Sequence, residues 1–209
     1  MTVNIPKKLW HVWIGPKPAP KEWMDTWPEK HPDWEYCVID NRVLSSLSFK
    51  NQLQIDTYIQ KGLYPGAADL IRYELLLEYG GLALEADSVC LNNTDELWTA
   101  ETDVCYTVYE NEHLRPGYVS PICAANPGNK FLDCIVNTLN RLKPTDCISP
   151  WRTTGNAFLA KMIETHCPDI VIFPSHYFIP KHYSTAHVRY AGADKVYADQ
   201  KWGTTTNCY

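Results

Sequence analysis

The chain contains no long hydrophobic run. No apolar stretch approaches the roughly 18 residues that a membrane span needs, and the apolar segment near the N-terminus is short and broken by His11. A secretory signal requires a longer uninterrupted apolar segment than this one. We therefore expect a soluble, non-secreted protein that has no membrane span.

The chain also lacks an excess of positive charge. Its 19 Lys and Arg against 24 Asp and Glu give a formal net charge of -5. Proteins that bind nucleic acid normally carry a basic surface, so we expect no nucleic-acid partner.

Closely spaced cysteine pairs are absent as well. The eight cysteines are scattered without a C-x-x-C pair or zinc-ligand spacing, which predicts free thiols in a reducing cytosol. No internal repeat or linker divides the 209 residues. A chain of this length can bury one α/β core, and we expect a single domain over residues 1–209.

Apolar patterns and turn residues predict alternating strands and helices. This alternation favours an α/β fold with a mostly parallel central sheet flanked by helices. The tail from Ser175 onward is polar and aromatic, and we expect it to be irregular. The predicted strands are 8–14, 34–39, 82–85, 104–109, 118–124 and 170–173, and the predicted helices are 21–30, parts of 42–61, 67–79, 129–142 and 155–166.

Two carboxylates follow the short apolar run that begins at Leu82. Glu85 and Asp87 flank Ala86, so their side chains leave the same face of an extended segment. Ligands of open α/β sheets lie beyond the carboxyl ends of strands, and Mg²⁺ or Mn²⁺ prefers oxygen ligands. The pattern indicates a site for a divalent cation that neutralises a departing diphosphate. The alternative is a solvated acidic turn.

Asp69 and Arg72 share a face of the preceding helix, because they stand three residues apart. One interpretation is a local ion pair on a solvated helix, which contributes little to stability. In the other, Asp69 accepts hydrogen bonds from the hydroxyls of a sugar, and Arg72 donates to the sugar or to a phosphate.

A tryptophan ends the first predicted strand. Trp13 could stack on a flat base while the backbone of Val12 and Ile14 contacts the edge of that base, or it could pack in the core. Stacking on a base contributes about 1–3 kcal/mol. The neighbouring His11 could be a core histidine or part of the same site.

Three blocks of sequence carry a resemblance to a known family. They are IPKKLWHVWIGPKPAP with the following HPDWEY, then ADLIRYELLLEYGGLALEAD, and a weaker C-terminal block, ADQKWGTTT. In these blocks the chain resembles the DxD-type glycosyltransferases of the sugar-binding-region family, which includes yeast initiating α-mannosyltransferases and compact bacterial and large-virus enzymes. It is more distantly similar to the glucosylating domain of large clostridial toxins.

The resemblance implies a GT-A-like fold and a retaining transfer of a hexose or deoxyhexose. The donor would be a nucleoside-diphosphate sugar, with UDP favoured over GDP because the first two blocks are most like those of UDP-sugar users. The acceptor would be a glycan or glycoprotein, bound near the loop 110–116 and after Pro174. The implied location is the cytoplasm of a bacterial cell or of a virus-infected host.

The family pattern also implies roles for individual residues. Asp69, Arg72 and Asp87 would be catalytic, and Glu85, Asp87 and Gln200 would hold Mn²⁺ or Mg²⁺. Two positions depart from the pattern, since Glu85 replaces an aspartate and Gln200 replaces the usual histidine. The third ligand therefore stays open between Gln200, Asp199 and water. The predicted donor-binding set is His11, Val12, Trp13, Ile14, Gly15, Asp69, Arg72, Glu85 and Ala86.

Two other functions remain at this point. A nucleotidyltransferase would need a glycine-rich phosphate loop after the first strand, which the segment Gly15-Pro16-Lys17-Pro18 matches poorly. An inactive relative that only binds a carbohydrate or nucleotide sugar would account for the two departures from the pattern.

Overall fold

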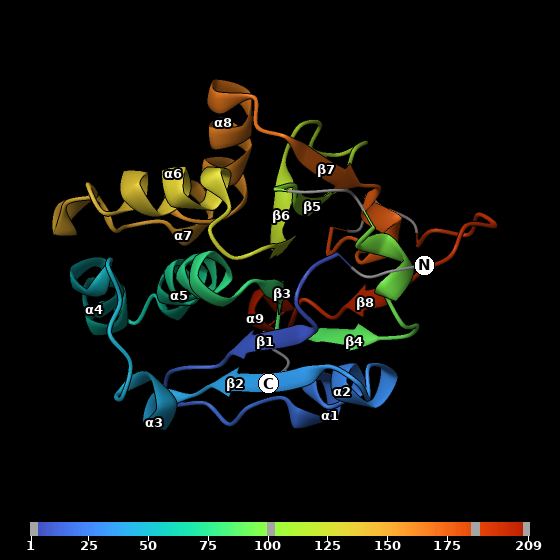
Figure 1. Cartoon of the computed structure of the whole chain (residues 1–209), viewed down its shortest axis with the longest axis horizontal. Coiled ribbons are helices and arrows are strands. Elements are labelled where there is room, and N and C mark those ends of the chain that lie inside the picture. The colour runs from blue at the N-terminus through green and yellow to red at the C-terminus, as the bar shows by residue number, and fades with distance from the viewer. Residues whose placement is uncertain (1–3, 100–102, 185–188, 207–209) are drawn as a thin grey trace.

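A six-stranded sheet lies at the centre of the molecule (Figure 1), in a computed structural model that describes residues 4–99, 103–184 and 189–206. β1 pairs in parallel with β2 and β3, β5 pairs in parallel with β7, and β6 is antiparallel to both of its neighbours. The predicted α/β fold with a mostly parallel sheet is therefore confirmed. In spatial order the strands are β2 (Glu35–Ile39), β1 (Lys8–Val12), β3 (Gly81–Leu84), β6 (Val119–Ala125), β5 (Cys105–Tyr109) and β7 (Ile170–Phe173).

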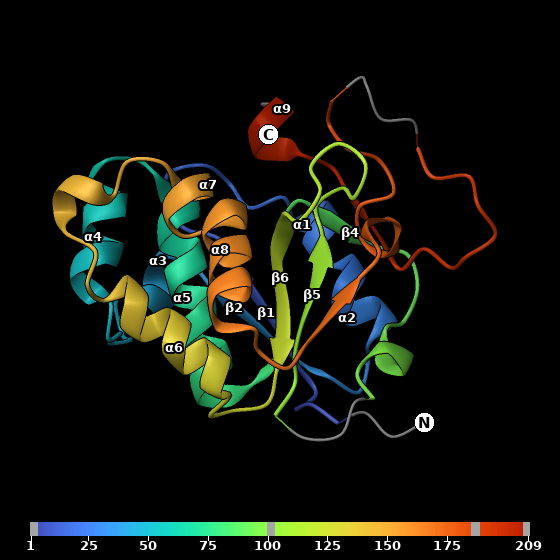
Figure 2. The same cartoon turned by 90° about the horizontal axis from the view of Figure 1, so that it is seen from above.

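Helices cover both faces of this sheet, as Figure 2 shows. The larger group, on one face, is α4 (Gln52–Gln60), α5 (Tyr64–Tyr79), α6 (Lys130–Leu139), α7 (Pro150–Thr153) and α8 (Asn156–His166). The opposite face carries α1 (Lys21–Met24) and α2 (Thr26–Lys30), while α3 (Asn41–Leu44) follows β2. Three 3₁₀ helices complete this part, η1 (Asp95–Leu97), η2 (Pro144–Asp146) and η3 (Ser175–Tyr177). Within the described ranges, no helix combines the length and apolarity of a membrane span.

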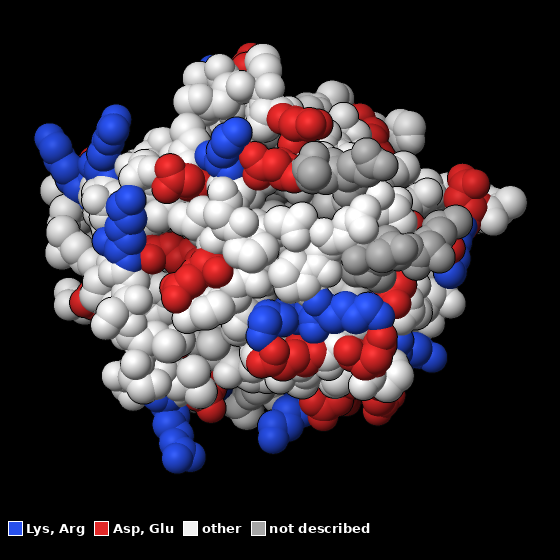
Figure 3. Space-filling model, viewed as in Figure 1, with Lys and Arg blue, Asp and Glu red and all other residues white. Residues whose placement is uncertain are grey.

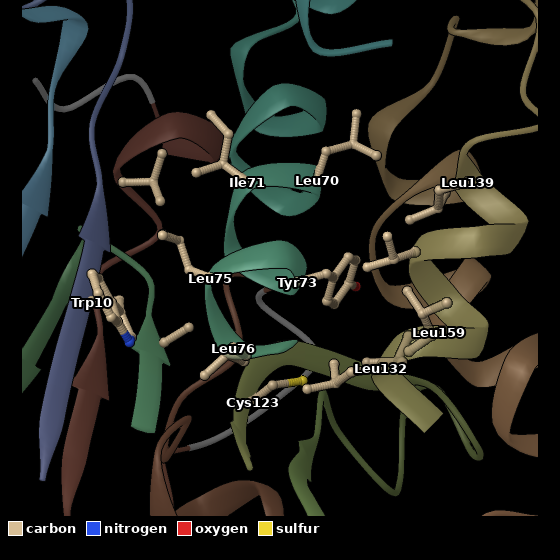
Figure 4. Close-up of a cluster of buried hydrophobic side chains, with 14 of the residues drawn as sticks. Trp10, Leu70, Ile71, Tyr73, Leu75, Leu76, Cys123, Leu132, Leu139 and Leu159 are labelled. Atoms are coloured by element: carbon tan, nitrogen blue, oxygen red, sulfur yellow. The ribbon is translucent and has the colours of Figure 1, made fainter. Parts of the chain in front are cut away.

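Alternating strand residues fill two separate cores. Trp10 and Ala83 pack with α5, α6 and α8, whereas Leu9, Leu82 and Leu84 pack on the other face of the sheet. This is the period of two that an extended chain imposes. Figure 4 shows the first core between α5 and its neighbours. Each fully buried aliphatic side chain contributes about 1.5–3 kcal/mol, so these contacts fix α5 against the sheet.

Two glycines join α5 to β3. Gly80 and Gly81 have φ angles of 66° and 100°, which side chains rarely tolerate. A Cβ atom on Gly81 would lie 2.5 Å from the backbone oxygen of Lys8 in β1. The pair therefore allows α5 to end abruptly and β3 to lie directly beside β1.

Three of the differences from the expected elements bear on the site. The helix expected over 21–30 is two short helices, because α1 ends at Met24 and α2 begins at Thr26. The first strand ends at Val12 rather than at residue 14. The tail after Pro174 is irregular over most of its described residues, as expected, but it also contains η3, a strand and a short helix.

That C-terminal strand, β8 (Ala198–Gln200), pairs antiparallel with β4 (Ser88–Cys90) in a second, two-stranded sheet. The short helix α9 (Gly203–Thr206) follows it. β4 begins directly after the predicted acidic pair, so this small sheet brings the C-terminal block to the end of β3.

Basic and acidic side chains are interspersed on the face shown in Figure 3. Local ion pairs form around the start of β1, where Lys7 is paired to Asp33 and Asp95, and Lys8 is paired to Glu35. Exposed pairs of this kind contribute at most about 1 kcal/mol each. This face therefore presents no broad field of one sign.

The cysteines have no disulfide partners in the described part of the chain. Seven of them are free thiols, and most of these are buried or half-buried. The prediction of free thiols is confirmed for these seven, while Cys208 lies outside the described residues.

Candidate active site

A cavity of about 660 Å³ opens at the edge of the sheet where β1, β3 and β5 end and β6 begins. Most of the predicted site residues lie on its wall, although they come from opposite ends of the sequence. The lining includes Val12, Trp13, Ile14, Asp69, Arg72, Glu85, Ala86, Asp87 and Gln200.

Asp69 and Arg72 lie inside this wall, on the N-terminal half of α5. Their residues are only 5% and 3% exposed, so the ion pair on a solvated helix is not what forms here. Arg72 Nη1 donates to Glu85 Oε1 at 2.6 Å and to the backbone oxygen of Pro121 at 3.1 Å. Its Nη2 lies 3.7 Å from Asp69 Oδ1. Arg72 thus links the helix to the ends of β3 and β6.

Asp69 is held by a second contact that has no sequence signal. The hydroxyl of Thr154 donates to Asp69 Oδ2 at 2.8 Å, and a Cβ atom on Gly155 would lie 3.3 Å from the same oxygen. Burial raises the pKa of Asp69 to about 7. The carboxyl group is therefore fixed in place, and its charge is sensitive to pH near neutrality.

The acidic pair lies where β3 ends. Asp87 is 7% exposed, while Glu85 is more accessible and bound to Arg72. Burial, followed by the nearby negative charge of Glu85, raises the pKa of Asp87 to about 6. A cation bound here would stabilise the charged form of Asp87. The solvated acidic turn does not fit the burial of Asp87.

Gln200 reaches this pair from β8. Its Nε2 donates to Asp87 Oδ1 at 2.6 Å, and its Oε1 is buried without a hydrogen-bond partner among the described residues. Buried polar atoms are normally paired, so this amide oxygen is available to a ligand. Asp199 points to the opposite side of the strand, where Arg189 and Lys201 bind its Oδ2 at 3.1 and 2.7 Å. The geometry favours Gln200 over Asp199 beside the acidic pair.

The three side chains fit a hard divalent cation. Two carboxylates and one amide supply oxygen atoms alone, which is the donor set that Mg²⁺ and Mn²⁺ prefer. The described residues contain no group of three or more His, Cys, Asp and Glu that could hold a metal ion. A metal here would thus use the amide of Gln200 and leave further positions to ligand oxygens or water.

The other end of the cavity is formed by the loop after β1. Trp13 Nε1 donates to the backbone oxygen of Lys17 at 2.9 Å. Asn41 bridges the backbone nitrogen and oxygen of Gly15 at 2.9 and 2.8 Å. Gly15 has a φ of 108°, and an added Cβ would lie 3.1 Å from the ring of Tyr64. The loop is therefore fixed with Trp13 half-buried on the cavity wall.

Two predicted donor-binding residues are not part of the lining. His11 is fully buried, its Nδ1 lies 3.0 Å from the hydroxyl of Tyr36, and burial lowers its pKa to about 3. Gly15 shapes the loop but does not line the cavity. His11 and Gly15 therefore lie outside the cavity lining and support the residues that form it.

The sequence patterns did not single out other residues of the lining. Glu110 and Arg115 follow β5, Trp151 and Asn156 belong to α7 and α8, and Tyr183 follows η3. Three of them, Glu110, Arg115 and Tyr183, lie in the loop 110–116 and in the segment after Pro174, where the acceptor was expected. Trp151 and Asn156 stand in no spaced motif.

The fold is similar to that of a solved glycosyltransferase. The PaToxG glycosyltransferase matches with a TM-score of 0.64 and 14% sequence identity, over 78% of this chain and 70% of that one. The GT-A-like architecture predicted from the sequence is confirmed by this match.

Sequence comparison identifies the region that contains the acidic pair. Residues 20–104 match the family described as "Glycosyltransferase sugar-binding region containing DXD motif". A curated relative, the initiation-specific alpha-1,6-mannosyltransferase of Candida albicans, is 28% identical over 110 residues. That match covers 48% of this chain and 28% of the relative, so the chain aligns with well under half of that protein. The family resemblance seen in the sequence motifs is confirmed for this region.

Proposed function

We propose that the protein is a metal-dependent, retaining glycosyltransferase. It would move a hexose or deoxyhexose from a nucleoside-diphosphate sugar, with UDP favoured and GDP possible, to a glycan or glycoprotein acceptor. The observation that carries the proposal is the oxygen-rich corner of the cavity that Glu85, Asp87 and Gln200 line together. There the amide nitrogen of Gln200 donates to the buried carboxylate of Asp87, and its amide oxygen has no partner among the described residues. The match of residues 20–104 to a glycosyltransferase region supports the same activity.

The nucleotide would occupy the end of the cavity next to β1. Trp13 supplies a ring for the base, and the backbone of Val12 and Ile14 lies beside it on the wall. Stacking of an aromatic ring on a base contributes about 1–3 kcal/mol. From there the diphosphate would extend toward the acidic pair.

Glu85, Asp87 and Gln200 would hold Mn²⁺ or Mg²⁺. When bound, the cation would neutralise the charge that develops on the departing diphosphate. In the structure Glu85 bonds to Arg72, while Asp87 accepts from the amide nitrogen of Gln200 and the amide oxygen of Gln200 has no partner among the described residues. Glu85 has one more methylene than aspartate, and it would act on the cation through water or after it separates from Arg72.

Asp69 and Arg72 would orient the donor sugar. The bond between C1 and the diphosphate oxygen breaks, and its electron pair leaves with the diphosphate. The acceptor hydroxyl bonds to C1 from the same face, through an oxocarbenium-like state, and its proton passes to the leaving phosphate oxygen. Asp69, held by Thr154 and beside Arg72, is placed to accept from sugar hydroxyls rather than to attack C1.

The proposal extends to the whole of the given sequence and to its location. Residues 1–209 would act as a single domain. The reaction would take place in the cytoplasm, of a bacterial cell or of a virus-infected host.

A thermal-shift screen tests the donor and metal site together. UDP- and GDP-sugars are added with and without Mn²⁺, and the correct donor at about 100 times its Kd should stabilise the protein by about 2.7 kcal/mol. Asp87→Asn should lose the Mn²⁺-dependent part of this shift. Asp199→Asn is the matched control, because Asp199 faces away on the same strand pair, and it should keep the shift.

The activity assay separates transfer from binding alone. Wild-type protein should hydrolyse or transfer the stabilising donor only with Mn²⁺ or Mg²⁺, whereas a binding-only relative would do neither. An Asp87→Asn variant that keeps its Mn²⁺-dependent shift and turnover would refute the proposed site.

A further inference from the structure

The cavity continues beyond the proposed donor site along the edge of the sheet. β1 and β3 carry Trp13 and Glu85, and the next strands in spatial order are β6 and β5. Ser120 and Pro121 of β6, and Glu110 directly after β5, line the same cavity. The half over β6 and β5 is thus adjacent to the sugar end of the donor site but separate from the base end.

A buried carboxylate anchors this second half. Glu110 is 2% exposed, and its Oε1 accepts from Arg115 Nη1 at 2.8 Å and lies 3.2 Å from His182 Nε2. Its Oε2 accepts from Asn156 Nδ2 at 3.1 Å. Buried charges require such pairing. The positive charge of Arg115 balances the negative charge of Glu110. The group as a whole therefore presents fixed polar atoms with little net charge.

Aromatic rings complete the wall around this ion pair. The guanidinium of Arg115 lies 5.4 Å from the ring centre of Trp151 and 5.8 Å from that of Tyr183, and its Nη2 donates to the Tyr183 hydroxyl at 2.8 Å. The ring of Trp202 lies 5.0 Å from that of Tyr183. Tyr183 is nevertheless 40% exposed, which leaves ring surface open to a ligand.

The indole N–H of Trp151 adds a hydrogen-bond donor. Its Nε1 is buried and makes no hydrogen bond within the described ranges, although buried indole N–H groups usually have a partner. This half of the cavity thus combines flat apolar rings, an unused donor and a neutral polar network. Such a combination is suited to orienting a ligand that has one apolar face and a polar rim.

We propose that this half of the cavity binds an uncharged pyranose unit of the acceptor. A pyranose has a C–H face that can stack on Tyr183 and hydroxyls that can reach Glu110 and Asn156. An acidic or phosphorylated acceptor would gain little here, because the guanidinium of Arg115 is already paired with Glu110 at 2.8 Å. The inference rests on the proposed transferase function, and it specifies that the acceptor is recognised through its sugar rather than through a peptide.

Binding of simple sugars tests this inference without turnover. Saturation-transfer NMR is recorded with methyl α- and β-pyranosides of glucose, galactose and mannose, in the presence of UDP and Mn²⁺. At least one pyranoside should bind the wild type, and Tyr183→Ala should weaken that binding about tenfold, since an aromatic contact contributes about 0.5–1.5 kcal/mol beyond its buried area. Trp151→Leu is a second variant and should weaken it similarly.

Tyr79→Ala is the matched control. Tyr79 is 41% exposed, nearly as much as Tyr183, but it ends α5 ten residues after Asp69, about 15 Å along the helix axis. This variant should bind the pyranoside like the wild type.

Two results would overturn the inference, namely no binding of any pyranoside or equal binding by wild type and both cavity variants. Competition by a Ser- and Thr-containing peptide in place of the sugars would assign the site to a peptide and overturn it as well. These outcomes are distinct from failure of the proposed function, which is decided by the Mn²⁺-dependent donor shift and turnover.

Discussion

Replacing Asp69 with asparagine should make the stability of the metal-free protein less sensitive to pH. Asp69 is buried, and burial raises its pKa from an ordinary 3.8 to about 7. The folded state therefore binds a proton that the unfolded state releases, over the range from about pH 4 to about pH 7. Stability contributed by this proton is fully present below pH 3.8 and is lost as the pH rises through 7.

The magnitude follows from the two pKa values. At 1.36 kcal/mol per pKa unit, the difference between 3.8 and about 7 corresponds to about 4 kcal/mol. Asparagine preserves the shape of the side chain and can still accept from the Thr154 hydroxyl that now bonds to Asp69. Arg72 keeps its bond to Glu85 at 2.6 Å, so the substitution mainly removes the ionisation.

Urea unfolding in EDTA, at intervals from pH 4.5 to pH 8, measures the effect. The free energy of unfolding of Asp69→Asn minus that of the wild type should increase with pH, by about 3 kcal/mol over this range, because about 1 kcal/mol of the full effect falls below pH 4.5. Taking the difference cancels other titrating groups, including Asp87, to the extent that they are independent of Asp69. A difference that stays constant across this range would refute the assignment of a buried, proton-binding Asp69.

Two further predictions concern local structure. Gly81→Ala should lower the free energy of unfolding by about 1–3 kcal/mol more than Gly128→Ala does. The added Cβ at residue 81 would lie 2.5 Å from the backbone oxygen of Lys8, whereas Gly128, with a φ of 73°, has open space. Equal losses of stability in urea unfolding would show that β3 can move away from β1. Asn129→Ala should lower the free energy of unfolding by about 1–2 kcal/mol, because the Oδ1 of Asn129 accepts from two backbone N–H groups at the start of α6. Lys130→Ala, at the exposed first residue of the helix, should have little effect on stability. Similar losses for both variants would contradict the capping role of Asn129.

The parts of the site that were predicted from sequence are those governed by short-range patterns. The glycine pair stops α5, the apolar run forms β3, and the end of that strand delivers Glu85 and Asp87 to the cavity. Because parallel strands end at one edge, Trp13 was also expected there. The glycine pair and the acidic pair depend on spacing within about twenty residues, which a single sequence records.

The other half of the cavity depends on contacts between distant segments. Trp151 and Asn156 lie in and after a short helix that begins at a proline, and no period or spacing marks them. Thr154 meets Asp69 across 85 residues of sequence. Strand β8 has only three residues in a polar context. It is therefore extended because it pairs with β4, and its local sequence alone does not favour a strand.

The pairing of β4 with β8 affects the order in which the protein folds. Gln200 and Asp87, which meet in the proposed cation site, are separated by 113 positions, and closing so long a loop is entropically costly. Contacts of that range tend to form late in folding. The proposed cation site is then among the last parts to assemble, after the central sheet is in place, and a nascent chain that has not yet reached β8 lacks Gln200 at this site.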